Sequence, residues 1–502
     1  MIRTSRTNDA LPILFGTSGW RAVIADQFTF DHVALVTRAI ADYLDTHAGI
    51  DQPVIVGYDT RFLADRFARC AADVLAAQGR RVLLADRDVP TPVVAHAILH
   101  RRAAGGVNLT ASHNPPEYCG IKFSPAWGGP ALPDATRWIE ARIAALRDQD
   151  DGASVQSTGS IEDFSPRDAY LAHVNTVIDF PAIRAAKLRV AVDVLHGTAR
   201  GYLDALLAAE GCDVAVLHDR LDPLFGGSAP DPSERRLTEL SALVRDGRYH
   251  LGVATDGDAD RFGVVDADGA YISANEVLAL VVDYLIRTRG AQGGVARSVA
   301  TSHLVDAVAA RHGRPVYETG VGFKYIGRLI AEGKLVAGGE EAQGLTIGGH
   351  VPDKDGILTC LLLVEMVAKT GKPLRIQLEE LVATVGPRYY LRVDRPVSPG
   401  GVDQLRERLG RLSGIGDFPI VRRIEVEGVA KLYVDDSSWV IIRPSGTEPV
   451  VRVYAESTSP ERAEALLAAG ITLTDSAPAS DEAEPVLASS HDRSYRKGTL
   501  HR

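Results

Sequence analysis

The feature that most constrains the fold of this chain is a repeated alternation of short β-rich apolar runs with longer amphipathic stretches. In the first block, apolar runs at 54–59 and 81–86 are followed by helical patterns at 64–78 and 91–99. Alternation of this kind is typical of α/β units with a largely parallel sheet. Blocks with the same strand, helix, strand order follow near residues 188 and 294. The sequence therefore predicts three topologically related α/β domains.

The pattern changes near Gly386 into shorter β-rich runs, which fit antiparallel strands with one or two helices. This predicts a smaller α+β fourth domain. The turn-rich segment 148–159 is a predicted linker. We therefore expect domains at 1–160, 161–273, 274–386 and 387–473, and a disordered tail over 474–502, which has hardly any large apolar residues.

Composition limits the function classes. The 502-residue chain is too long for one hydrophobic core, since single cores stop growing near about 250 to 300 residues. Its formal charge of −10 provides no basic field for nucleic acid or anionic lipid. Apolar runs are all shorter than the roughly 20 residues of a membrane helix, and the polar N-terminus lacks a secretory signal, so we expect a cytoplasmic protein. The four cysteines form no C-x-x-C pair and are predicted to be reduced and buried.

The first motif that could carry chemistry is T-A-S-H-N-P at 110–115. The run 106–110 predicts a strand that delivers Ser112 to the carboxyl end of a sheet, where open α/β folds bind ligands. By itself, a Ser-His-Asn-Pro turn is most simply a side chain bonding its own backbone. The absence of a G-x-S-x-G elbow argues against acyl transfer. The role of Ser112 thus depends on what other segments bring beside it.

Three carboxylates crowd the second motif, D-G-D-A-D-R at 256–261. Asp256, Asp258 and Asp260 follow an apolar strand, and they would repel one another without a cation. Hard oxygen ligands favour Mg²⁺, which commonly completes its shell with phosphate oxygens. An EF-hand is excluded because its Gly and Glu positions are Arg261 and Ala267 here. A solvated acidic turn is the alternative.

Two further loops suit a phosphorylated sugar. The stretch G-G-E-E-A-Q-G at 338–344 carries Glu340 and Glu341, whose carboxylates could accept hydrogen bonds from neighbouring hydroxyls, although such loops are also common as solvated turns. The stretch R-P-S-G-T-E-P at 443–449 combines a guanidinium with hydroxyls and backbone N–H groups, which makes a good cradle for a phosphate dianion. A turn capped by Ser and Thr is the alternative there.

Together and in this order, the four motifs resemble those of the α-D-phosphohexomutases, the family of phosphoglucomutase and phosphomannomutase. The match extends to about residue 473, and F-G-T-S-G-W-R at 15–21 resembles the N-terminal motif of the family. The resemblance implies a heart-shaped molecule of four domains with a central cleft. It also implies an isomerase of carbohydrate metabolism, a monomer or homodimer, that interconverts the 1-phosphate and 6-phosphate of glucose or mannose.

The resemblance also implies residue roles. Ser112 would carry the phosphoryl group and pass it to a hexose 1-phosphate, which gives a bound hexose 1,6-bisphosphate; the other phosphate would then return to Ser112. Mg²⁺ would be bound by Ser112 with the three aspartates of the second motif. Lys122 would do general acid/base work, with His113 as a supporting donor and Arg21 as an active-site cation. The implied substrate-binding residues are Arg261, Lys324, Glu340, Ala342, Arg443, Ser445, Gly446, Thr447 and Arg452.

One departure from the family pattern bears on the choice of sugar. The family usually has Ser where this chain has Ala342, and Gly is common where it has Gln343. A lost hydroxyl removes one hydrogen bond to the sugar, worth about 0.5–1.5 kcal/mol, and Gln343 is a candidate replacement. Phosphoglucosamine mutase, which shares the same motifs, stays open as an alternative. So do a sugar-phosphate phosphatase and a non-catalytic binding protein.

Overall fold

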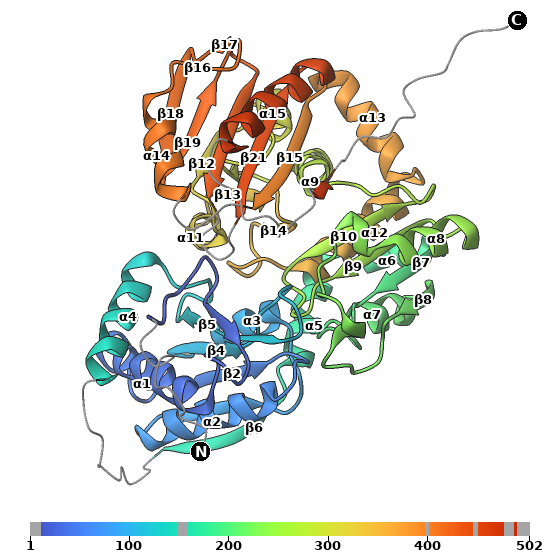
Figure 1. The fold of residues 1–502 in the computed structure, drawn as a ribbon. Coiled ribbons are helices and arrows are strands. Elements are labelled where there is room, and N and C mark those ends of the chain that lie inside the picture. Colours follow the sequence, from blue (N-terminus) through green and yellow to red (C-terminus); the bar gives the residue numbers. More distant parts are fainter. Residues whose placement is uncertain (1–11, 148–158, 397–400, 445–449, 476–485, 489–502) are drawn as a thin grey trace, which may run out of the picture.

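The structure is a computed structural model that describes residues 12–147, 159–396, 401–444, 450–475 and 486–488. Figure 1 shows domain I (blue) and domain II (green) in the lower part of the view, and domain IV, in orange and red, above them, where it overlaps domain III. The predicted class is confirmed: three related α/β domains carry mixed sheets, and the C-terminal domain carries an antiparallel sheet. Residues 148–158 of the predicted linker 148–159 and, apart from a short strand, the tail beyond residue 475 lie outside the described residues.

Domain I is built on a six-stranded sheet in the order β1-β5-β4-β2-β3-β6. Its strands are β1 (Trp20–Val23), β2 (Val54–Tyr58), β3 (Arg81–Ala85), β4 (Gly105–Leu109), β5 (Tyr118–Pro125) and β6 (Ser160–Phe164). Its helices are α1 (Phe30–His47), α2 (Ala64–Ala77), α3 (Thr91–Arg101) and α4 (Pro133–Arg147). Helices α1, α2 and α4 cover one core, whereas α3 packs into a second core that continues into domains II and III.

Domain II has a four-stranded sheet in the order β10-β9-β7-β8. Its strands are β7 (Arg189–Asp193), β8 (Asp213–Leu217), β9 (Leu251–Thr255) and β10 (Phe262–Asp266). Its helices are α5 (Arg167–Val177), α6 (Phe180–Ala186), α7 (Leu203–Ala209) and α8 (Thr238–Gly247), with short 3₁₀ turns η1 (Phe225–Gly227) and η2 (Glu234–Arg236). Strands β7, β8 and β9 are parallel, and β10 returns antiparallel to β9.

Domain III repeats this arrangement, with the order β14-β13-β11-β12. Its strands are β11 (Gly294–Ser298), β12 (Val316–Thr319), β13 (Leu335–Glu340) and β14 (Gly344–Ile347). Its helices are α9 (Ala274–Arg289), α10 (Leu304–Arg311), α11 (Phe323–Ala331), α12 (Gly356–Thr370) and α13 (Leu374–Val385). Helix α9 begins at a capping box, in which Ser273 and Glu276 each bond the other's backbone N–H, and ends at Gly290 with a left-handed φ of 59°.

The shared topology places the sequence motifs at equivalent loops. In each α/β domain one parallel strand turns back into an antiparallel neighbour: β4 into β5, β9 into β10, and β13 into β14. Ser112 lies in the first of these loops, the three aspartates of 256–260 lie in the second, and the glutamates of the sugar motif begin the third. Three corresponding loops therefore supply the candidate site.

Domain IV has an antiparallel sheet in the order β18-β19-β20-β21-β15-β22. Its strands are β15 (Tyr389–Pro396), β18 (Arg422–Val426), β19 (Val429–Tyr433), β20 (Trp439–Pro444), β21 (Val450–Ser457) and β22 (Val486–Ala488), with a small ladder of β16 (Gly414–Ile415) and β17 (Phe418–Pro419). Helices α14 (Gly401–Arg411) and α15 (Pro460–Asp475) complete it. A separate apolar cluster joins Trp439 and Tyr454 to Val299 and Ala300 of domain III, and the buried Lys431 donates across this boundary to Val299 O (2.9 Å).

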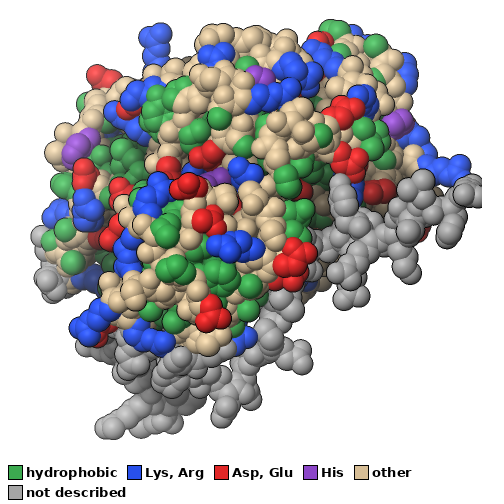
Figure 2. All heavy atoms as spheres, turned by 90° about the horizontal axis from the view of Figure 1, so that it is seen from above, with side chains coloured by type: hydrophobic (Ala, Val, Ile, Leu, Met, Phe, Trp, Pro, Cys, Tyr) green, Lys and Arg blue, Asp and Glu red, His purple; other side chains and the backbone are tan. Residues whose placement is uncertain are grey.

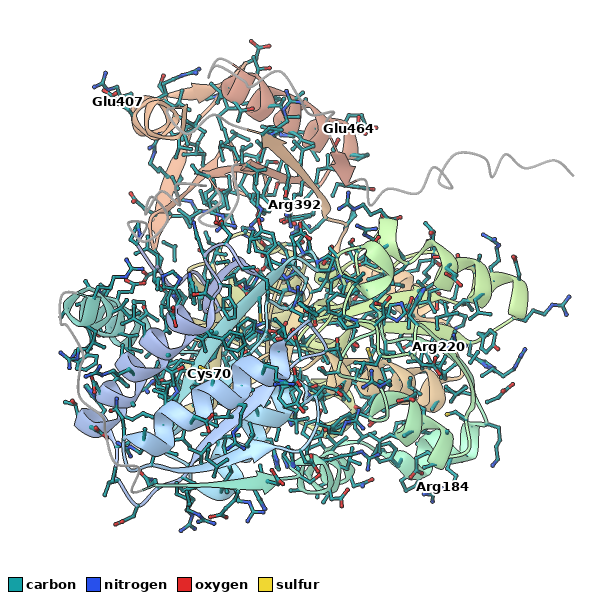
Figure 3. The ribbon with its side chains drawn as sticks, turned by 60° about the horizontal axis from the view of Figure 1, so that its bottom comes forward. Cys70, Arg184, Arg220, Arg392, Glu407 and Glu464 are labelled. Atoms are coloured by element: carbon teal, nitrogen blue, oxygen red, sulfur yellow. The ribbon has the colours of Figure 1, made fainter. Side chains whose placement is uncertain are left out.

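Surface properties agree with the composition. On the face shown in Figure 2, acidic and basic side chains are interspersed. Among the described helices, none is both long and apolar enough to cross a membrane. All four cysteines are free thiols, as expected, and three are buried. The exception is Cys70, which is only half-buried because it lies on the outer helix α2 (Figure 3), so the prediction of burial was wrong for this residue.

Candidate active site

Ser112 lies three residues beyond the end of β4 and is buried, with 1% of its surface exposed. Its backbone is left-handed (φ 55°), and its N–H donates to Thr110 Oγ1 (2.9 Å). Its hydroxyl donates to Asp256 Oδ2 of domain II (2.6 Å). The close approach needs Gly257, because a Cβ there would stand 2.7 Å from the Ser112 carbonyl oxygen. The structure therefore joins the serine motif directly to the aspartate motif.

Asp256, Asp258 and Asp260 are all buried, and each offers a carboxylate oxygen within 4.8 Å of those of the other two. Both Asp256 oxygens are engaged, one by Ser112 and one by the backbone N–H of Arg261 (3.0 Å). By contrast, Oδ1 of Asp258 and Oδ1 of Asp260 accept no hydrogen bond from the described part of the chain. Buried carboxylate oxygens without donors are costly unless a cation binds them. The three residues thus fit a Mg²⁺ site on the chemistry of their donors.

Lys122, on β5, bridges two of these carboxylates: Nζ lies 2.6 Å from Asp258 Oδ2 and 2.6 Å from Asp260 Oδ2. Although burial opposes it, these carboxylates raise the pKa of Lys122, so the ammonium form is held at neutral pH. Thr91 Oγ1 donates to Asp258 Oδ2 (2.5 Å), and Lys354 Nζ lies 3.2 Å from Asp260 Oδ2. The loop is therefore partly neutralised by cations from domains I and III.

Two more predicted residues flank the serine. His113 Nδ1 lies 3.4 Å from Ser112 Oγ, and burial followed by repulsion from Arg261 holds the pKa of His113 well below its ordinary value, which keeps the ring neutral. Arg21, on β1, donates to Asn114 Oδ1 (2.6 Å) on the same loop. The Arg261 guanidinium lies 3.9 Å from Asp231 at the edge of the aspartate loop. The structure thus brings together all the predicted residues of the catalytic centre.

The sugar loop divides its two glutamates between different tasks. Glu341 accepts from Ser298 Oγ (2.8 Å) and lies within reach of Tyr454 OH of domain IV (3.5 Å), so the protein itself engages this carboxylate. Glu340 accepts only the N–H of Gly322 (2.8 Å) among the described donors, and burial, then the neighbouring Glu341, raises its pKa to about 7. Glu340 is therefore the better placed of the two to meet a sugar hydroxyl.

Gln343 points toward domain II. Its amide nitrogen donates to Tyr271 OH (3.0 Å) and Pro232 O (3.3 Å), and its backbone carbonyl accepts from the N–H of Phe262 (3.2 Å). Its backbone is left-handed, with φ 63°, at the position where the family commonly has Gly. The amide nitrogen thus ties the sugar loop to the metal-loop domain. Ala342, beside it, is half-buried.

The distal phosphate cradle is described in part. Ser445, Gly446 and Thr447 lie outside the described residues, but Arg443 and Arg452 face each other on β20 and β21. Arg443 Nε is buried without a partner among the described groups. Arg392, at the base of domain IV in Figure 3, pairs with Asp394 through two 2.8 Å contacts. Lys324, on α11, lies 5.6 Å from the Tyr325 ring centre, and burial lowers its pKa.

Several residues near the site were not among the predicted site residues. Arg61 holds the serine loop through its backbone carbonyls, and Asn108 donates to Thr91 Oγ1 (2.9 Å) beneath Lys122. Asp353 and Lys354 belong to the stretch P-D-K-D-G at 352–356, directly after β14. Only this last pair had a local clue, because two charged residues follow the glycine-rich sugar loop.

Comparison with known proteins agrees with this geometry. Models of phosphoglucomutase/phosphomannomutase α/β/α domains I, II and III match residues 12–150, 168–269 and 273–385, and the C-terminal domain model matches 392–471. A phosphoglucomutase/phosphomannomutase of Thermococcus kodakarensis is 32% identical over 92% of this chain and 99% of its own. A protein of Methanothermobacter thermautotrophicus assigned as a phosphoglucosamine mutase is 34% identical over 90% and 95%. A solved structure from Thermus thermophilus, assigned as a phosphomannomutase, is 34% identical over 93% and 99%, with a TM-score of 0.78.

Proposed function

The chain belongs to the phosphoglucomutase/phosphomannomutase family, and from that premise we propose that Ser112 is the phosphoryl carrier of a phosphohexomutase. The enzyme interconverts hexose 1-phosphate and hexose 6-phosphate. The observation that carries the proposal is the 2.6 Å contact between Ser112 Oγ and Asp256 Oδ2, which joins a buried hydroxyl of domain I to the aspartate loop of domain II. A structural turn serine would have no reason to meet a buried carboxylate cluster 144 residues away.

The reaction begins with Ser112 phosphorylated. The bond between Ser112 Oγ and phosphorus breaks and a bond forms to the 6-oxygen of a hexose 1-phosphate; Lys122 gives a proton to Oγ, and the amine so formed takes up the proton of the 6-hydroxyl. Lys122 lies among the carboxylates facing the serine as an ammonium, so it supplies a proton and neutralises charge on the moving group. Asp256 Oδ2 then accepts the hydrogen bond from the restored hydroxyl.

The second half of the reaction reverses these steps with the other phosphate. The hexose 1,6-bisphosphate turns over within the site, and its 1-phosphate moves to Ser112, which leaves hexose 6-phosphate. We assign Arg443 and Arg452, with Ser445, Gly446 and Thr447, to hold whichever phosphate is not reacting, because a guanidinium and hydroxyls suit a dianion. Glu340, Arg261 and Lys324 would contact the sugar and its phosphate.

Magnesium completes the centre. Asp256, Asp258 and Asp260 with Ser112 would hold Mg²⁺, which when bound supplies positive charge to the phosphoryl oxygens. The donor-free Oδ1 atoms of Asp258 and Asp260 support this assignment. The partners we propose are sugar phosphates alone, handled by a monomer or homodimer in the cytoplasm.

Glucose and mannose phosphates are the proposed substrates. Glucosamine phosphate is the second candidate, because a relative assigned to that activity is as similar as the others. Coupled assays with glucose, mannose and glucosamine 1-phosphates rank these sugars directly. A ratio of kcat/KM favouring glucosamine 1-phosphate would replace the first assignment with the second.

The carrier role is tested with Ser112→Ala, assayed with glucose 1-phosphate, Mg²⁺ and trace glucose 1,6-bisphosphate. We expect activity to fall by about 10³-fold or more, because the covalent carrier is lost. The matched control is Ser438→Ala, which removes another buried hydroxyl, bonded to Ser457 in domain IV (3.0 Å). Full activity in Ser112→Ala would overturn the proposal, and release of inorganic phosphate by the wild type would indicate a phosphatase instead.

A further inference from the structure

Arg61 is a completely buried arginine whose five N–H groups all have acceptors. Nε donates to Asp59 Oδ2 (3.1 Å). The four remaining N–H groups donate to backbone carbonyls of the serine loop, those of Ser112 (2.7 Å), Asn114 (2.7 Å), Pro115 (2.7 Å) and Tyr118 (2.9 Å). Both Arg61 and Asp59 have side chains with 0% exposure. The serine loop therefore wraps around the Arg61 guanidinium, which binds four of the loop's carbonyl oxygens.

This arrangement bears directly on the conformation of Ser112. A left-handed φ in a residue other than Gly costs about 1–3 kcal/mol and persists only where the surroundings enforce it. Ser112 has φ 55°, and its carbonyl is one of the oxygens that Arg61 binds. Its N–H is fixed by Thr110, whose hydroxyl donates to the same Asp59 oxygen that Arg61 binds (2.6 Å). The Ser112 carbonyl is thus held by Arg61 directly, and the Ser112 N–H is held through Thr110 by Asp59.

The same carbonyl is close to domain II. The Ser112 carbonyl oxygen lies so near the aspartate loop that a Cβ at position 257 would stand 2.7 Å from it. The Phe225 ring covers the Arg61 guanidinium, with its centre 5.0 Å from Cζ. A shift of the serine loop would therefore move Oγ relative to Asp256 and press the carbonyl against the aspartate loop. In phosphoryl transfer the catalytic advantage comes mainly from positioning and charge, so a displacement of about 1 Å can cost roughly 10²-fold in rate.

We propose that Arg61 is a positioning residue for the reaction, which holds Ser112 in the one backbone conformation that aims its Oγ at the aspartate loop. The inference rests on the proposed carrier role of Ser112. Because its side chain is fully buried and its N–H groups all have protein acceptors, Arg61 would act through the carbonyls of the loop and not by contact with the substrate. Charge alone does not suffice, because a lysine offers three donors from a single atom and cannot reach four carbonyls and a carboxylate at once.

The test compares Arg61→Lys with Arg80→Lys. Arg80 is also a fully buried arginine of domain I, but it binds Asp45 and the Gly49 carbonyl at the end of α1, remote in sequence from the serine loop. For each protein, the rate at which glucose 1,6-bisphosphate phosphorylates Ser112 is measured in a single turnover by mass spectrometry. Steady-state kcat and KM and the thermal midpoint Tm are measured on the same preparations.

We expect both variants to lose stability, whereas only Arg61→Lys loses phosphorylation rate and kcat, by about 10²-fold, with KM within about threefold of the wild type. Equal rates in the two variants at a temperature where both are folded would overturn the proposal, as would a loss confined to KM. If Arg61→Lys does not fold, Asp59→Asn keeps the guanidinium but loosens its orientation, and an unchanged kcat in that variant would likewise overturn it. Failure of the wild type itself to accept phosphate on Ser112 would refute the carrier role instead.

Discussion

Two buried lysines lie at two different domain boundaries and have different surroundings. One belongs to the candidate active site, and the other helps to hold two domains together. Lys122, between domains I and II, faces two aspartates at 2.6 Å, beside carboxylate oxygens that no described donor satisfies. Lys431, between domains III and IV, donates to Val299 O (2.9 Å), His303 Nε2 (2.7 Å) and Glu318 Oε1 (3.2 Å), and lies 4.0 Å from the Trp439 ring centre.

The difference lies in the balance of charge. Around Lys122 the carboxylates are in excess, which raises the lysine pKa and leaves oxygens for a further cation. Around Lys431 burial dominates and Arg297 adds repulsion, which lowers its pKa to about 7. Glu318 is already paired with Arg297 (2.7 Å), and the buried Glu456 accepts from Trp439 Nε1 (3.0 Å), so neither carboxylate is dedicated to the lysine. A buried lysine by itself therefore indicates no function; what differs is whether the carboxylates around it or its burial dominate its pKa.

The largest expected effect separates the two lysines by activity. Lys122→Met should lower kcat by about 10³-fold, within the range for loss of a general acid or base, because the ammonium beside the phosphoryl group is removed. Lys431→Met should leave kcat within about threefold of the wild type. Steady-state assays of both variants check this. Comparable losses in the two would show that the boundary between domains III and IV also takes part in the chemistry.

The next largest effect is a pH dependence of the free energy of unfolding, which we expect from Lys431. Its pKa is about 7 in the folded protein and ordinarily 10.5, so between these values the unfolded chain binds the proton that the folded chain has released. The stability contributed by this group therefore rises as pH increases from 7 to 10.5, by about 5 kcal/mol in total. Urea unfolding of wild type and Lys431→Met at pH 7, 8, 9 and 10 measures the difference. A difference that stays constant with pH would contradict the assignment.

Magnesium should stabilise the folded protein through the aspartate loop, at the boundary between domains I and II. A ligand at 100 times its Kd stabilises the folded state by about 2.7 kcal/mol, and we expect MgCl₂ to do so for wild type and Lys431→Met alike. Asp258→Asn keeps the side-chain volume but removes a carboxylate ligand, so most of the increase should disappear. Urea unfolding with and without MgCl₂ reports binding without any assay of activity. An undiminished increase in Asp258→Asn would place the cation elsewhere.

The smallest expected effect concerns the link between the sugar loop and domain II. Gln343→Ala and Gln343→Gly remove the same hydrogen bonds to Tyr271 and Pro232, but only alanine retains the cost of a left-handed φ. The alanine variant should therefore be less stable than the glycine variant by about 1 kcal/mol. Chemical denaturation of the pair checks this, and equal stabilities would show that the turn relaxes when the side chain is lost.

Much of the fold follows from local periodicity. The predicted strand at 54–59 is β2 (Val54–Tyr58), and the predicted helix at 64–78 is α2 (Ala64–Ala77), because a short apolar run and a helical apolar pattern are properties of neighbouring residues. The motifs of the candidate site also stand out in the sequence, since their unusual residues lie close together. Their meeting was anticipated only through the family resemblance.

What could not be predicted depends on partners distant in the chain. Arg61 follows an ordinary strand, and nothing nearby indicates that it binds carbonyls 51 to 57 residues later. Gln343 was a candidate replacement for the hydroxyl lost at Ala342, and no local pattern indicated that its amide nitrogen bonds Pro232, 111 residues away. Such contacts are set by the packing of domains, for which a single sequence carries no local signal.

The burial of three cysteines has a practical consequence for this enzyme. A thiol must ionise to react with electrophiles or oxidants, and burial raises the pKa of Cys119 and Cys360 strongly and that of Cys212 to about 11. Cys119 lies on the strand that carries Lys122, yet it is shielded from reagents. Maleimide should therefore attach at Cys70 first. A spectroscopic label could thus be attached to the unmodified protein at Cys70, on the outer helix α2 of domain I.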